Sequence, residues 1–170
     1  GMNLVTFADD ATPLGSSTIA ATFTFFRSQS GVLLFDEADI AVSSSLAFST
    51  SGEDGKYDIQ SVLTHEIGHF LGLDHAALVS SVMVPFGTPS QLDQRTLSYD
   101  DIAGVTEIYP NLSNPTPAGQ IRGVIRAGTG AVFGAHVVAV DRDGTPLVST
   151  LSQRDGSYLI RFLPPGSYRV

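Results

Sequence analysis

The chain has 170 residues, of which 42% are hydrophobic and 15% charged, and its formal net charge is −8. This composition fits one large domain or two small ones, permits a packed core and excludes global disorder. The nine lysines and arginines form no basic stripe, which excludes a typical nucleic-acid partner. Cysteine is absent, so disulfides and thiolate ligands are excluded, and no apolar run is long enough to cross a membrane.

In the first fifty residues the candidate strands are enriched in threonine and phenylalanine, which favours strands. A helix is predicted next, because the apolar residues of Ile59–Leu71 follow the helical period. Asp58 suits its N-cap, and Gly72 can end it with a positive φ. The predicted strands are Asn3–Phe7, Ile19–Phe26 and Phe35–Val42.

A second helix is predicted at Tyr99–Tyr109, where Ser98 and Asp101 have the spacing of a capping box and Pro110 ends the pattern. The polar, proline-containing segment Asn111–Gly119 is then the clearest linker in the chain.

After the linker the hydrophobic period changes to two, which predicts a small antiparallel β module at residues 120–170. Asp143-Gly144 and Asp155-Gly156 are hairpin turn signals. His136 is interpreted as an ordinary strand residue. The predicted strands are Gln120–Arg126, Ala135–Asp141, Leu147–Ser152, Ser157–Leu163 and Ser167–Val170.

Three of the four histidines lie within eleven residues, in HEIGHFLGLDH. His65 and His69 are four residues apart and share a helix face, and a turn at Gly72 can bring His75 to the same metal. Three neutral imidazoles leave a fourth zinc position open for water, as in catalytic sites.

Glu66 follows the first of these ligands directly and can take a proton from the water, which makes it the candidate general base of a peptide hydrolysis. Two alternatives remain: a surface helix with incidental histidines, and a zinc site without catalysis.

The segment HEIGHFLGLDH matches the long metzincin signature HExxHxxGxxH. The segment SVMVP, with Met83 and Pro85, resembles the metzincin Met-turn, and its spacing of eight residues from His75 resembles that of matrixins. LSYDDIAGVTEIYP resembles the last matrixin helix, and Phe35–Val42 resembles the strand along which extended substrates lie. The resemblance covers roughly residues 3–110 and is closest to bacterial matrixin-like peptidases.

The resemblance implies an α+β metzincin-like domain at residues 1–110, with a twisted sheet, an active-site helix and a C-terminal helix. It implies one catalytic Zn²⁺, a protein or peptide substrate and a secreted or cell-surface location. It also implies that Asp100 and Asp101 give structural support, by anchoring the Met-turn and the mature N-terminus.

Several features depart from the matrixin pattern. Ala76 stands where matrixins usually have serine, and the loop that holds a second, structural zinc is absent. A first strand and a first helix are also missing, so we expect an N-terminally truncated domain whose exposed sheet edge favours homo-association. An acidic segment could bind Ca²⁺, although a solvated turn is favoured; its residues are Asp36, Glu37 and Asp39.

The β module resembles carboxypeptidase regulatory-like, transthyretin-like β-sandwiches, and we expect it to be C-terminally cut short at Val170. The resemblance implies an accessory role, and its residues are Gly123-Val124, Gly134–Val137, Asp155–Tyr158 and Leu163–Tyr168. The sequence therefore predicts a secreted zinc metalloendopeptidase with an appended β-sandwich. The alternative is a surface binding or adhesion protein that uses a degenerate peptidase domain as a scaffold.

Overall fold

The computed structural model describes residues 2–9, 14–111, 113 and 118–170. The chain forms two compact units, one of residues 1–74 and 85–96 and the other of residues 75–84 and 97–170. Within the described residues, no helix is both long enough and apolar enough to cross a membrane. The expected linker, Asn111–Gly119, lies partly outside the described residues, so the domain boundary there stays a prediction.

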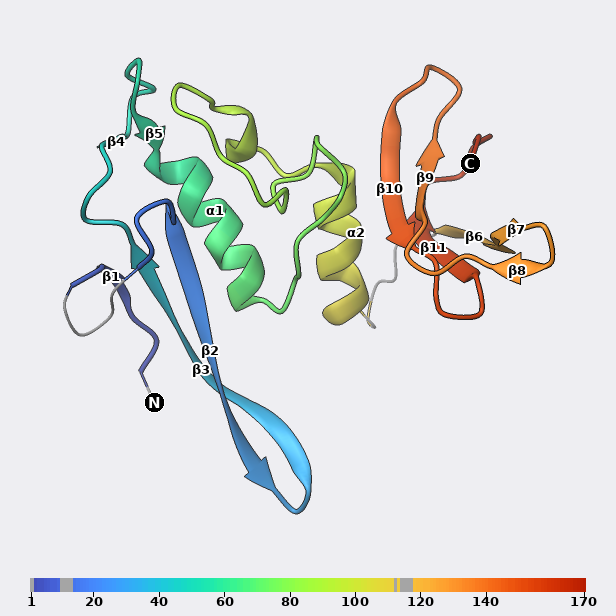
Figure 1. Ribbon diagram of the computed structural model, residues 1–170, viewed down its shortest axis with the longest axis horizontal. Helices are drawn as coiled ribbons and strands as arrows, with labels where there is room; N and C mark the ends of the chain where they lie inside the picture. Colours follow the sequence, from blue (N-terminus) through green and yellow to red (C-terminus); the bar gives the residue numbers. More distant parts are fainter. Residues whose placement is uncertain (1, 10–13, 112, 114–117) are drawn as a thin grey trace. The chain divides into compact units, whose positions relative to one another are not determined.

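The first unit combines a three-stranded sheet with the helix α1 (Ile59–Phe70). The strand order is β1-β3-β2, in which β1 runs parallel and β2 antiparallel to the central β3. Helix α1 contacts β2 and β3 (Figure 1). The strands of this unit are β1 (Val5–Phe7), β2 (Ala20–Gln29), β3 (Val32–Val42), β4 (Phe48–Ser49) and β5 (Tyr57–Asp58).

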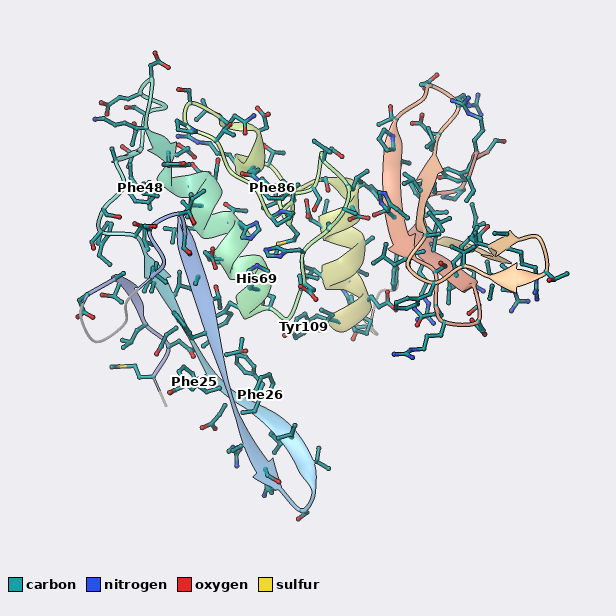
Figure 2. All side chains as sticks on the ribbon, in the orientation of Figure 1. Phe25, Phe26, Phe48, His69, Phe86 and Tyr109 are labelled. Atoms are coloured by element: carbon teal, nitrogen blue, oxygen red, sulfur yellow. The ribbon has the colours of Figure 1, made fainter. Side chains whose placement is uncertain are left out.

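The β2–β3 hairpin is longer than the sequence predicted. Pairing continues to the two-residue turn Ser30-Gly31, whose φ values are 52° and 81°. Two positive φ values match the twist of hairpin strands, so the turn sustains pairing where the side chains bury little surface. Phe25 and Phe26 lie on this hairpin (Figure 2) and are 46% and 58% exposed. Homo-association through this sheet stays a prediction.

Helix α1 begins at an N-cap that is also half of an ion pair. Asp58 accepts a hydrogen bond from the Ser61 N–H (2.8 Å), which caps the helix. Arg95 binds the same carboxylate through Nε (3.0 Å) and Nη2 (2.5 Å), so the short 3₁₀ helix η1 (Asp93–Arg95) is tied to the start of α1. The Arg95 guanidinium lowers the pKa of the Asp58 carboxyl to about 2.

Replacing Arg95 with glutamine is expected to lower the free energy of unfolding at neutral pH by up to about 2 kcal/mol, because the buried Asp58 loses its charged partner. The folded-state pKa of Asp58 lies below its ordinary value of 3.8. The stabilisation is therefore complete above that value and is lost as the pH falls through about 2. Urea unfolding of both proteins at pH 7 and pH 2.5 measures this; an equal difference at both pH values would contradict it.

The second unit combines the helix α2 (Tyr99–Ile108) with the strands of the β module. Helix α2 has the predicted capping box between Ser98 and Asp101. Strand β9 pairs with β10, β11 with β6, and β7 with β8, each antiparallel. These strands are β6 (Gly119–Val124), β7 (Arg126–Ala127), β8 (Gly130–Ala131), β9 (His136–Val140), β10 (Pro146–Leu151) and β11 (Ser157–Leu163).

Two details of the β module differ from the sequence prediction. The Asp155-Gly156 turn does not join a hairpin, because β11 leaves it to pair with β6, whose partner residues lie 33 to 44 positions earlier in the chain. The last predicted strand is reduced to an isolated bridge between Arg169 and Val140. The core of the unit contains a residue of α2, Ala103, with five residues of the module: Val137, Ala139, Val148, Ile160 and Leu163. The mixed helix and strand content agrees with the predicted α+β class, whereas the sandwich itself stays a prediction.

Candidate metal centre

The end of α1 reverses the chain in a two-hydrogen-bond cap. The Leu73 N–H donates to the carbonyl of Gly68 and the Gly72 N–H to that of His69, both at 2.9 Å. This is the pattern of a Schellman motif, whose turning residue needs a left-handed conformation. Gly72 has a φ of 95°, which a residue with a side chain rarely adopts. The glycine therefore lets the segment that carries His75 turn back at the end of the helix.

The three predicted ligands form a group that fits a metal ion. The Nε2 atoms of His65 and His69 are 3.1 Å apart, and His69 is labelled on α1 in Figure 2. Two nitrogens bound to one tetrahedral zinc are about 3.3 Å apart, so this spacing suits such an ion. The ligand atoms of these two residues and His75 lie within 4.8 Å of one another, and no other such group occurs among the described residues.

The orientation of His69 is set by the turn that follows its helix. Its Nδ1 lies 2.9 Å from the carbonyl oxygen of Leu73. Because a carbonyl only accepts, Nδ1 carries the proton of the neutral ring and Nε2 carries the lone pair that a metal requires. Metal-binding histidines generally use such a partner to fix tautomer and ring plane.

Glu66 is 5% exposed and is held by a residue of the sheet. The hydroxyl of Thr22, on β2, lies 2.7 Å from Glu66 Oε2 and 3.0 Å from its backbone carbonyl oxygen. A hydroxyl that donates to a carboxylate fixes its rotamer. Thr22 thus belongs to the site, although it lies 44 residues away in the sequence and no motif marks it.

The turn that contains Met83 is held from α2. Ser81 donates to Asp101 Oδ1 (2.5 Å), and the Val82 N–H donates to Asp101 Oδ2 (3.0 Å). The carbonyl of Met83 accepts the N–H of Ala76 (2.9 Å), the residue that follows His75. Met83 is only 3% exposed, whereas Pro85, the other predicted member of the turn, is exposed.

Asp100 and the acidic segment of β3 make other contacts. The Asp100 carboxylate accepts the Ser149 N–H (2.7 Å) of the β module. Burial raises the pKa of Asp100, and this hydrogen bond partly offsets that effect. Asp36 pairs with Arg27 (2.9 Å) on the hairpin, and Asp39 accepts the Leu4 N–H (2.9 Å). Binding of Ca²⁺ by this segment stays a prediction.

The order of strands in the sheet makes a strand other than Phe35–Val42 the candidate for binding substrate. The sequence assigned the substrate-binding strand to Phe35–Val42, which falls within β3. In the structure β3 is central, paired with β2 along its length and with β1 at its end. Strand β2 lies at an edge of the sheet and carries the Thr22 that contacts Glu66. Residue pattern alone does not give strand order, so the sequence could not show that β2 lies at the edge.

More than half of the chain resembles a known protein family. The matrixin family model matches residues 8–110. Matrilysin from Rattus norvegicus is 43% identical over 60 residues, which are 35% of this chain and 22% of that protein. Metalloendoproteinase 1-MMP from Arabidopsis thaliana is 49% identical over 55 residues (32% and 15%), and interstitial collagenase from Bos taurus is 44% identical over 60 residues (35% and 12%). The matched part thus spans less than a quarter of each of these relatives. This family match covers more than half of the chain, and the chain therefore belongs to the matrixin family.

Proposed function

We propose that the chain is a zinc-dependent endopeptidase in which His65, His69 and His75 hold the metal and Glu66 is the general base. The observation that carries this proposal is the convergence of three imidazoles beside a buried, oriented carboxylate. When bound, Zn²⁺ supplies Lewis acidity, which lowers the pKa of a water molecule and polarises a carbonyl group.

The remaining chemistry belongs to residues of the chain. Glu66 Oε2 accepts the Thr22 hydroxyl, so the carboxylate is fixed before substrate arrives and its other oxygen, Oε1, can take the proton of the attacking water. The same carboxyl group can then return that proton to the amine of the leaving peptide. Peptide hydrolysis by this route needs no covalent intermediate with the enzyme.

We further propose that an extended peptide adds to the outer edge of β2. An edge strand offers unpaired backbone groups, and main-chain pairing gives affinity without requiring one particular side chain. Strand β2 has this position, and its Thr22 contacts the general base. The substrate is therefore a protein or peptide, in keeping with the predicted secreted or cell-surface location, and the β module is an accessory part.

The test is metal-dependent proteolysis by the purified chain. One Zn²⁺ per chain is expected by elemental analysis after purification without chelator, because the three imidazoles form a single site for a tetrahedral ion. Hydrolysis of denatured casein should stop with 1,10-phenanthroline and return with added Zn²⁺. Failure to bind zinc even after reconstitution would refute the metal site. Zinc binding without hydrolysis would favour the alternative of a binding protein on a peptidase scaffold.

A further inference from the structure

Two neighbouring carboxylates in the first turn of α2 hold two different parts of the second unit. Asp101 accepts hydrogen bonds from Ser81 and Val82 in the turn that contains Met83. Asp100 accepts the Ser149 N–H from the middle of β10. Because the two aspartates are consecutive in one helical turn, a displacement of Asp100 by the β module also displaces Asp101.

The β module contacts α2 at several further points. The Tyr99 hydroxyl donates to the carbonyl of Phe162 (2.9 Å) in β11, and burial raises the pKa of Tyr99. Ala103, one turn further along α2, is 5% exposed and packs into the core of the module. An exposed ion pair between Glu107 and Arg161 (3.0 Å) adds a contact near the end of the helix.

The contact with Tyr99 depends on an irregular stretch of backbone. Phe162 has a φ of 60°, which is unusual for a bulky residue, and the pairing of β11 with β6 shifts register between Ile160 and Leu163. A bulge of this kind redirects a backbone group that a regular ladder would use. Here the Phe162 carbonyl accepts a hydrogen bond from α2, so a strained conformation accompanies the contact between helix and module.

The other end of this network reaches the third metal ligand. The Ser81 hydroxyl accepts the Met83 N–H (2.9 Å), and the Met83 carbonyl accepts the Ala76 N–H (2.9 Å). Ala76 directly follows His75. Hydrogen bonds and helix α2 thus form a continuous connection from the β module, through the turn of Met83, to the backbone beside His75.

We propose that the β module is a positioning element for the metal centre, acting on His75 through α2 and the Ser81–Met83 turn. The module and α2 share one core, so the module holds the face of α2 that packs into it. Asp101 then transmits that position to the turn, and the turn to the segment that begins at His75. The part of this inference that concerns zinc rests on the proposed function; the part that concerns the turn does not.

The experiment uses the 170-residue chain and the substitution Asp100→Ala, which removes the acceptor of the Ser149 N–H. The first readout is amide hydrogen exchange of the metal-free protein. Peptides that cover residues 76–84 should exchange at least about fivefold faster than in the unsubstituted protein, because local opening sets their protection. Peptides that cover α1, residues 59–70, should be unchanged. This readout needs neither metal nor catalysis.

The second readout is the zinc dissociation constant, measured by competition with a chromophoric chelator. We expect it to rise about tenfold in Asp100→Ala, the lower end of the effect of residues that orient metal ligands. Asp100→Asn, which keeps an acceptor oxygen, should restore most of the affinity. Glu107→Gln removes an exposed contact between α2 and β11 and should change neither readout.

Tyr99→Phe tests the same coupling from another contact and keeps the inference falsifiable if Asp100→Ala does not fold. It should raise exchange at residues 76–84 in the same direction. Unchanged exchange at 76–84 in folded Asp100→Ala, or in Tyr99→Phe where the first variant is unfolded, would overturn the proposal. Faster exchange everywhere, including α1, would also overturn it, because it indicates general destabilisation. If exchange at residues 76–84 rises as expected but the chain binds no zinc, the proposed function is refuted and this inference stands.

Discussion

Replacing Glu66 with glutamine is expected to lower the rate of peptide hydrolysis by about 10²-fold or more while zinc stays bound. Glutamine has nearly the same shape, and its amide oxygen can still accept the Thr22 hydroxyl that now binds the carboxylate at 2.7 Å. It cannot take a proton from water at neutral pH. The three histidines are unaltered, so metal content should remain that of the unsubstituted protein.

The measurement is kcat and KM on one fluorogenic peptide, with zinc determined in the same samples. A matched control is Glu37→Gln, which removes an acid from β3 that the resemblance offered only as a Ca²⁺ ligand; its kcat should remain unchanged. Turnover of Glu66→Gln near that of the unsubstituted protein, at equal zinc content, would show that another group takes the proton. Loss of zinc in Glu66→Gln would instead show that Glu66 helps to retain the metal.

The local parts of the site could be predicted because their causes lie within a few residues of sequence. Helix α1, its cap at Asp58 and the reversal at Gly72 follow from helical periodicity, capping chemistry and the freedom of glycine. The capping box of α2 was likewise correct. His65 and His69 share a face for the same local reason, since residues four apart on a helix are neighbours.

The parts that sequence reasoning missed depend on contacts between distant segments. Nothing near Thr22 indicates that it reaches Glu66, because the contact requires the order of strands in the sheet. The pairing of β11 with β6 was missed because a turn such as Asp155-Gly156 indicates a reversal but not which strand becomes the partner. Ala103 shares a core with the β module, which the sequence did not predict. The composition of the linker indicates a boundary between two segments, but it does not indicate whether the segments on either side pack together.

Replacing Asp101 with alanine is expected to destabilise the second unit by about 3 kcal/mol or more. Asp101 is 3% exposed, and its carboxylate accepts hydrogen bonds from Ser81, Val82 and Ser98. Alanine leaves the N–H groups of Val82 and Ser98 without this acceptor in a region that water reaches poorly. A buried donor left unpaired costs more than the net value of the hydrogen bond it loses.

The free energy of unfolding, followed by far-ultraviolet circular dichroism in urea without metal, measures this effect. Asp101→Asn keeps one acceptor oxygen but presents an NH₂ group to donors, so its loss should be smaller than that of alanine yet clearly measurable. Asp155→Ala, at an exposed turn of the same unit, is the control and should cost much less. A loss below about 1 kcal/mol for Asp101→Ala would mean that water replaces the carboxylate. The turn that contains Met83 would then be held by its own packing, and the connection from the β module to His75 would lack its central link.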